Sequence, residues 1–266
     1  MRQSRLVALR GSRQNPAMTN TSLLIAALVF LLAGTVKGVV GLGLPTVAMG
    51  LLALGMPGAT AATLLLVPSF ITNLWQIAPF GGLVPLLRRL WPMLLAAGVG
   101  TVAGGLLIGA PAGPWGSRAL GVTLVLYAGW GLFGRPPLVA PRHEPWLGPI
   151  MGLATGVVTA ATGVFVVPAV PYLQALGLSR TALIQAMGVS FTLSTVSLAV
   201  MLGGTGHLAA ATLGSSLLML APALLGVELG RRIRDRLSPA MFKRCFLIGL
   251  AALGAYMVIA SLGAAR

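Results

Sequence analysis

Apolar runs of about bilayer-spanning length recur along the whole chain, separated by short polar connections. The second and seventh runs are short for a span and contain Pro45 and Pro168. Such broken helices are tolerated at membrane depth only where protein or a water-filled cavity covers the freed backbone groups. Merging these two with their neighbours leaves about eight spans, so we expect eight to ten hydrophobic segments. The predicted segments are 22–40, 42–56, 59–80, 90–109, 117–133, 146–162, 164–177, 181–202, 212–230 and 245–262.

The composition agrees with a membrane location. The chain of 266 residues is 57% hydrophobic and 8% charged, with a mean hydropathy of +0.95. A soluble domain carries about a quarter charged residues, so an ordinary soluble domain is excluded. We therefore expect an all-α, polytopic integral membrane protein with broken helices, in contact with the lipid bilayer.

The net charge of +15 raises the alternative of nucleic-acid binding. However, the basic residues lie in short connections between apolar runs, as at Arg88-Arg89 and in 231–236. The preference of cytoplasmic loops for Lys and Arg predicts this distribution, so no nucleic-acid partner is expected. With residue 20 outside, the arginine-bearing connections 81–89, 134–145, 178–180 and 231–244 all fall inside.

Residues 1–20 form a polar, basic leader without periodicity. No apolar core with a small-residue cleavage site follows at the length of a signal peptide. Met18 stands just before the first apolar run, so a disordered tail and a misplaced start codon both remain open.

Glycines indicate an internal duplication. After a shift of 122 residues, six of the 13 glycines between residues 34 and 107 coincide with a glycine, whereas 36 glycines in 266 residues give about two by chance. We expect two transmembrane repeats, 21–133 and 146–262, joined by a cytoplasmic connection at 134–145. Each repeat has five segments, and an odd number predicts that the halves are inverted, as in many secondary transporters.

The first glycine-rich break, 34–45, contains the only charged residue between Arg13 and Arg88, which is Lys37. A lysine deep in a bilayer costs about 3 kcal/mol, so it faces a partner, a cavity or the interface. One interpretation is an anion ligand beside helix ends whose N–H groups glycine leaves accessible. The other is a lysine that extends to the membrane surface. The candidate binding residues here are Lys37, Gly38, Gly41, Gly43 and Pro45.

The second break, 156–168, has threonines in place of the lysine. Its candidate residues are Thr159, Thr162, Gly163 and Pro168. The threonines can donate hydrogen bonds to an anion, or they can bond their own helix carbonyls and pack between helices. We expect the two breaks to face each other and to form a substrate site.

A third polar group follows each break: Asn73 and Gln76 in the third segment, and Gln185, Ser190, Thr192, Ser194 and Thr195 in the eighth. With the repeat shift, Asn73 corresponds to Thr195. A central substrate pathway and hydrogen bonds between helices explain these residues equally well.

Residues for other chemistry are scarce. Cys245 is the single cysteine, the two histidines lie in connections, and only three acidic residues occur. No nucleotide-binding loop or catalytic set is visible, so we expect no metal, no cofactor and no enzymatic activity. Glu228 precedes Arg231 and Arg232 at helical spacing, which favours an ion pair over a role in proton or ion coupling.

The breaks and the turns after them resemble the sulfite exporter family often called TauE/SafE. The resemblance lies in 34–45 followed by Leu54-Gly55-Met56-Pro57, and in 156–168 followed by Leu176-Gly177-Leu178-Ser179. It implies a multi-pass permease of the bacterial inner membrane that exports sulfite or an organosulfonate. Members look to have runs of consecutive glycines at the breaks, whereas this chain reads Gly-Leu-Gly-Leu-Pro and Ala-Thr-Gly-Val-Phe. A different substrate, or binding through other backbone positions, therefore stays open.

Together these patterns favour a secondary transporter for a small anion that works by alternating access between the two repeats. The alternatives are a permease for a different solute and a non-transport membrane protein such as an assembly or partner-binding subunit.

Overall fold

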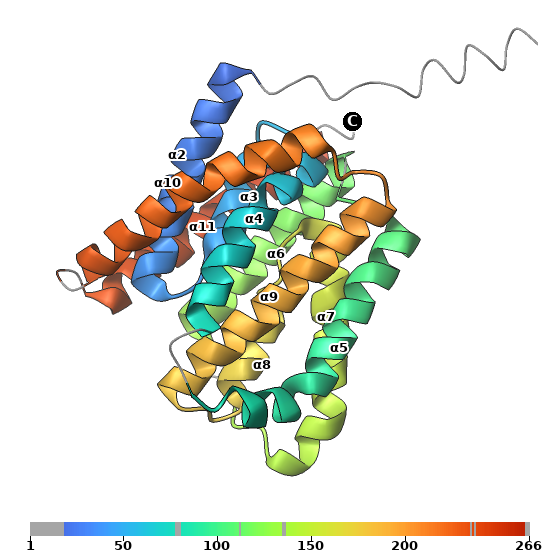
Figure 1. Ribbon diagram of the computed structural model, residues 1–266, viewed down its shortest axis with the longest axis vertical. Helices are drawn as coiled ribbons and strands as arrows, with labels where there is room; N and C mark the ends of the chain where they lie inside the picture. Colours follow the sequence, from blue (N-terminus) through green and yellow to red (C-terminus); the bar gives the residue numbers. More distant parts are fainter. Residues whose placement is uncertain are drawn as a thin grey trace, which may run out of the picture.

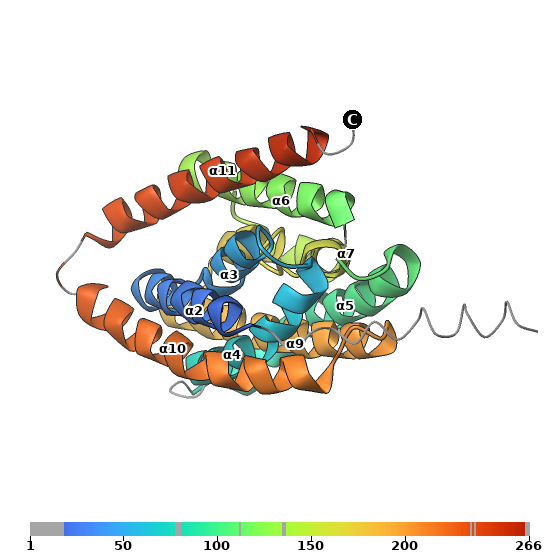
Figure 2. The same ribbon diagram turned by 90° about the horizontal axis from the view of Figure 1, so that it is seen from above.

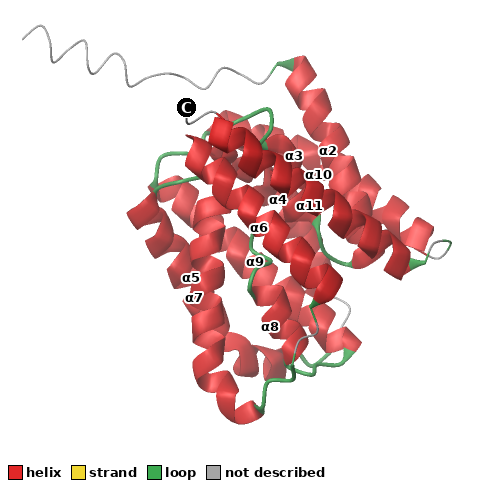
Figure 3. Cartoon of the chain, turned by 180° about the vertical axis from the view of Figure 1, so that it is seen from behind, coloured by secondary structure: helices red, strands yellow, loops and turns green. Residues whose placement is uncertain are grey.

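The computed structural model describes residues 19–77, 81–111, 113–134, 137–234, 236 and 238–263. Apart from Thr19 and Asn20, the predicted leader 1–20 lies outside the described residues. Within these residues the chain folds into ten α-helices, with no strand (Figures 1 and 3). The helices are α2 (Asn20–Val40), α3 (Leu44–Leu52), α4 (Gly58–Ile77), α5 (Leu83–Ile108), α6 (Gly113–Phe133), α7 (Glu144–Thr162), α8 (Ala169–Ala175), α9 (Arg180–Gly204), α10 (Ala210–Arg234) and α11 (Pro239–Gly263).

The predicted all-α membrane architecture is confirmed, and each predicted apolar segment corresponds to one helix. Six helices in the described part are long and apolar enough to cross a membrane. The two segments expected to be broken pieces are the short helices α3 and α8, and most of their residues are buried. Two helices begin earlier than hydropathy predicts, α5 at Leu83 and α11 at Pro239. Their second turns carry arginine or lysine, which are good helix formers but interrupt an apolar run.

The helices pack as pairs of partners distant in sequence. Helix α2 lies against α10, α5 against α7, α4 against α9, and α6 against α11. Figure 2 shows α6 and α11 together on one side of the molecule and α4, α9 and α10 on the other, with α3 between them. The helices alternate in direction, so one end of the bundle collects the ends of α2, α4, α6, α8 and α10. We call it the basic end, because Arg89, Arg231 and Lys243 lie near it.

Glycines set the closest helix contacts. A Cβ at Gly34 of α2 would lie 2.2 Å from the carbonyl oxygen of Ala223, and one at Gly226 of α10 would lie 2.1 Å from that of Leu31. The pair α5–α7 has the same kind of contact. A Cβ at Gly156 would lie 2.3 Å from the oxygen of Ala97, and one at Gly100 would lie 2.6 Å from that of Leu153. Small residues let helix backbones approach closely in membranes, where packing replaces the hydrophobic effect as the attraction.

A serine of α10 forms hydrogen bonds with the backbone of α4 where a proline interrupts the helical pattern. Pro68 has no N–H, so the carbonyl oxygen of Leu64 lacks its normal helical donor. The Ser216 hydroxyl donates to that oxygen at 2.8 Å, and its own oxygen accepts from the N–H of Val67 at 3.1 Å. Ser216 thereby satisfies the exposed backbone and fixes α10 against α4 at the bend.

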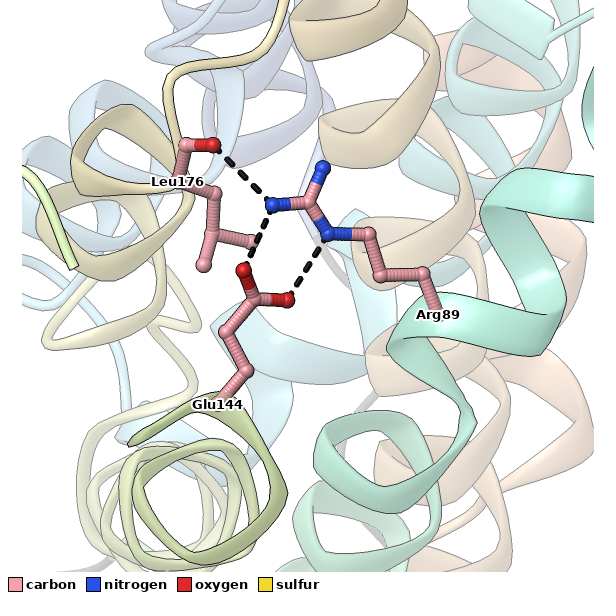
Figure 4. A network of polar contacts seen from close by, with 3 residues as sticks. All are labelled: Arg89, Glu144 and Leu176. Carbon is pink, nitrogen blue, oxygen red and sulfur yellow. Dashed lines mark hydrogen bonds and ion pairs between the residues drawn. The ribbon is translucent and has the colours of Figure 1, made fainter. Parts of the chain in front are cut away.

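An ion pair ties three elements together at the basic end (Figure 4). The Arg89 guanidinium donates to both carboxylate oxygens of Glu144, at 2.8 and 2.6 Å, and to the carbonyl oxygen of Leu176 at 3.1 Å. Glu144 lies in the first turn of α7, where the helix dipole stabilises a negative charge. Leu176 follows α8. One side chain of α5 therefore holds the start of α7 and the end of α8.

We expect Gly226→Ala to destabilise the protein, because the new methyl group meets backbone that cannot move aside. Such overpacking costs about 1–3 kcal/mol, which lowers Tm by roughly 2–10 °C for a chain of this size. Thermal unfolding of the purified protein in detergent measures it. Gly214→Ala is the matched control in α10, since a Cβ there has nothing within 4 Å. Equal Tm shifts in the two variants would contradict the close contact.

Candidate functional site

Lys37 lies inside the bundle and does not extend to the membrane surface. Its side chain comes from the last turn of α2 and is 5% exposed. The Lys37 ammonium donates to the Thr72 hydroxyl at 3.0 Å and to the Asn73 amide oxygen. Both acceptors lie in α4 and are buried. A cation at the C-terminal end of a helix is also favoured by the helix dipole.

These contacts continue into a polar chain between three helices. The Asn73 amide donates to the Ser69 hydroxyl at 3.2 Å, and Thr195 of α9 donates to Ser69 at 3.3 Å. Thr72 donates at 2.7 Å to the carbonyl oxygen of Pro68, which leaves its own oxygen free to accept from Lys37. The network orients the amide oxygen of Asn73 toward Lys37 and links α2, α4 and α9.

The first break supplies the wall beside Lys37. Gly41 has a φ of 82°, which ends α2 in the left-handed conformation, and its N–H donates to the Lys37 carbonyl oxygen at 2.7 Å. Glycine takes this conformation without a steric penalty. The Gln76 amide then donates at 2.7 Å to the carbonyl oxygen of Gly41, which joins the break to the end of α4.

A cavity of about 470 Å³ opens beside Lys37 at the basic end. An ammonium has three N–H donors. Lys37 uses two of these donors for its partners among the described residues, Thr72 and Asn73. One donor therefore remains for a ligand in the cavity. The Gln76 amide oxygen is buried and has no hydrogen-bond partner in the described part of the chain. The lining residues are Lys37, Gly38, Gly41, Thr72, Trp75, Gln76, Ile184, Val227, Arg231 and Arg234.

The remaining candidates of the first break do not line this cavity. A Cβ at Gly43, whose φ is 114°, would lie 2.9 Å from the side chain of Val36 and 3.3 Å from that of Phe246 in α11. Pro45 follows in the first turn of α3 and is buried. The start of α3 therefore packs toward α11, and its N–H groups are not part of the cavity wall.

The second break lies elsewhere. The hydroxyls of Thr159 and Thr162 each donate to a carbonyl of their own helix at 2.7 Å, and Gly163 ends α7 with a φ of 72°. Thr162 lines a different cavity, of about 270 Å³, with residues of α3 and α6. Pro168 lines an apolar groove between α6, α7 and α8. The structure does not bring these four residues to Lys37.

The candidates of α9 are buried but also stand apart from the cavity. Gln185, Ser190 and Ser194 are 3%, 1% and 2% exposed, and none of them lines it. The Ser190 hydroxyl has no partner among the described residues. Asn73 and Lys37 are thus the predicted residues from different segments that meet directly.

Sequence reasoning left several cavity residues out of the candidate set. Thr72 was missed, although Ser69, Thr72, Asn73 and the already noted Gln76 follow the spacing i, i+3, i+4 and i+7. This spacing places them on one face of an otherwise apolar helix. That polar stripe was the available signal. Trp75 resembles an interfacial anchor, and the arginines of α10 resemble topology signals, so neither pattern suggested a cavity.

The polar side chains that the described lining of the cavity contains are cationic or neutral. Among the described residues, no three His, Cys, Asp or Glu side chains gather into a group that could hold a metal ion. The chemistry that the arrangement offers is a buried cation, hydroxyl and amide groups, and a water-accessible space. Such a set suits the binding of a small anion.

Comparison with known proteins gives one finding. A family model described as Sulfite exporter TauE/SafE matches residues 26–257, a range that includes both breaks and the cavity. The comparisons with curated proteins and with solved structures found no match.

Asn73→Leu should destabilise the protein through Lys37. The ammonium loses a buried acceptor, and hydrogen bonds to charged groups contribute about 1.5–3 kcal/mol. Adding Lys37→Met removes the charge, so we expect part of the lost stability to return. A double-mutant cycle of Tm in detergent measures the coupling. Strictly additive losses would contradict a direct bond between the two side chains.

Proposed function

We propose a substrate for this chain, and the proposal starts from one premise: the chain belongs to the sulfite exporter TauE/SafE family. Members of that family are membrane transporters, and this chain is accordingly a multi-pass membrane transporter. We propose that it is a secondary transporter for a small anion, with sulfite or an organosulfonate as the substrate. In this proposal Lys37 is the buried counter-charge of the anion.

The observation that carries the proposal is the position of Lys37 on a cavity whose described lining contains no carboxylate to neutralise it. Its two partners in the described part of the chain are uncharged. A buried ammonium without a negative partner is costly, and an anion in the cavity offsets that cost. The cavity volume of about 470 Å³ falls in the range of small-molecule sites. A sulfur oxyanion or small sulfonate accepts hydrogen bonds from several directions, which suits the one ammonium donor of Lys37 that Thr72 and Asn73 leave free.

Alternating access between two inverted repeats is the proposed mechanism. Helix packing supports it, because the first helix of each half lies against the fourth helix of the other, α2 on α10 and α7 on α5. Gly34 and Gly156 are 122 residues apart and make equivalent contacts with alanine carbonyls. In the partner helices, Gly226 of α10 lies against the carbonyl oxygen of Leu31, and Gly100 of α5 lies against that of Leu153. Gly100 is one turn away from Gly104, the glycine that the 122-residue shift pairs with Gly226.

At the opposite end of the bundle the cavity lined by Thr162 is smaller, about 270 Å³ against about 470 Å³ beside Lys37. Gly163 corresponds to Gly41 after the shift of 122 residues. A Cβ added to Gly163 would lie 2.8 Å from the side chain of Met49, and one added to Gly105 of α5 would lie 2.1 Å from that of Met201. Methionine side chains fill irregular gaps and are flexible, so they suit a closure that must open in the alternate state.

The proposed location is the bacterial inner membrane, with the basic end in the cytoplasm. Arg88, Arg89 and Arg180 lie in helices that begin at this end, and Arg231 lies in a helix that finishes there. Cytoplasmic connections of membrane proteins carry an excess of Lys and Arg. The cavity beside Lys37 then opens to the cytoplasm, as loading for export requires.

Transport in proteoliposomes tests the function. The purified protein is given a panel of labelled anions, including sulfite and taurine-like sulfonates, with labelled cations as comparison. We expect saturable anion uptake, and Lys37→Gln should lower kcat/KM by roughly 10- to 150-fold, the equivalent of a lost charge-assisted hydrogen bond. Lys243→Gln, which removes a charge from the groove between α6 and α11, is the control and should change little. Undiminished anion transport by the Lys37→Gln variant would contradict the proposed role of Lys37.

A further inference from the structure

The mouth of the Lys37 cavity carries a second group of cations, on α10. Val227, Arg231 and Arg234 line the cavity at spacings of four and three, so they share one face of the helix. The guanidinium carbon of Arg231 lies 5.9 Å from the centre of the Trp75 ring, which also lines the cavity. This cation–π contact favours a position of the guanidinium at the mouth.

The positive charge at the mouth is only partly compensated. The predicted ion pair of Glu228 is present, but its carboxylate lies 2.9 Å from Arg232 and 3.6 Å from Arg231. Glu228 therefore neutralises mainly Arg232, which does not line the cavity. Arg234 has no carboxylate within 4 Å among the described residues. In sequence, 228–236 holds four arginines and two carboxylates, a net charge of 4 − 2 = +2.

The mouth group adjoins the deep site without being part of it. A Cβ at Gly38 would lie 2.9 Å from the backbone nitrogen of Arg231, so α10 and the end of α2 are in direct contact there. The side chain of Lys37, in contrast, has its hydrogen-bond partners among the described residues on α4. The cavity thus has an outer cation pair and an inner cation on different helices. A solute coming from the basic end meets the outer pair first.

We propose that Arg231 and Arg234 form a capture site for small oxyanions, which concentrates substrate at the mouth before it reaches Lys37. The inference rests on the proposed transport function. Charge of one sign in a cleft raises the local concentration and association rate of an oppositely charged solute by about 10- to 1000-fold. The effect needs positive charge rather than a particular geometry, and it weakens with salt because the Debye length is about 8 Å at physiological ionic strength.

A role limited to membrane topology would not require these positions. Topology depends on the number of basic residues near the ends of the spans, whichever way they point. Arg232 on the same turn has a side chain that is 77% exposed and lies outside the cavity. The separation of cavity-lining from outward-facing arginines on one helix is what a capture site requires.

Initial transport rates in proteoliposomes, with sulfite as the probe, test the proposal against substrate and salt concentration. For Arg231→Gln with Arg234→Gln, we expect KM to rise about 10-fold at low salt, while kcat stays within about twofold. The difference from the unchanged protein should shrink as salt increases. A variant with lysine at both positions keeps the charge and should keep the low KM. The matched control is Lys243→Gln with Arg244→Gln, which removes the same two charges from the groove between α6 and α11.

The outcomes separate this inference from the proposed function. Unchanged KM in the double variant, with transport still dependent on Lys37, overturns the capture site alone. The same holds if the Lys243→Gln with Arg244→Gln control raises KM equally, or if kcat falls while KM stays constant. If the lysine variant behaves like the glutamine variant, charge is not the operative property and the proposal fails. No saturable transport of sulfite or any other anion by the unchanged protein would overturn both proposals.

Discussion

The burial of the Lys37 ammonium is the constraint on which the site depends. A lysine inside an apolar bundle needs acceptors, because hydrocarbon provides none. Asn73 and Thr72 supply them from α4, and Ser69 holds Asn73 in turn. This requirement explains why an otherwise apolar helix carries a polar stripe within reach of Lys37. With one donor left over, the same arrangement that makes the cation tolerable also leaves it able to bind an anion.

The backbone around the site is interrupted at places where other helices compensate. Gly41 ends α2, and Gln76 binds the carbonyl oxygen exposed there. Pro68 breaks the ladder of α4, and Ser216 replaces the missing donor. Irregular backbone of this kind survives at membrane depth only when protein or a cavity satisfies it. At each of these two interruptions a single side chain binds the freed carbonyl oxygen.

Much of the fold was predictable from sequence, and less of the site. Hydropathy and glycine punctuation predicted the ten helices, since span length and helix breaking are local properties. Lys37 and Asn73 were both predicted as site residues, but their contact depends on how α2 and α4 face each other. Thr162 shows the converse: its break resembles the first in sequence, yet it lies by a separate cavity. The role of Arg231 at a cavity was unpredictable because an arginine that sets topology has the same sequence pattern.

The most direct test of the central claim is a crystal structure of the protein grown with selenite, an analogue of sulfite that can be located by anomalous diffraction. We predict a selenium peak in the cavity within about 4 Å of the Lys37 nitrogen, as a hydrogen bond to one of its oxygens requires. The peak should be absent from Lys37→Met crystals grown under the same conditions. A peak that persists without the lysine, or one found only beside Thr162 at the second break, would contradict the account.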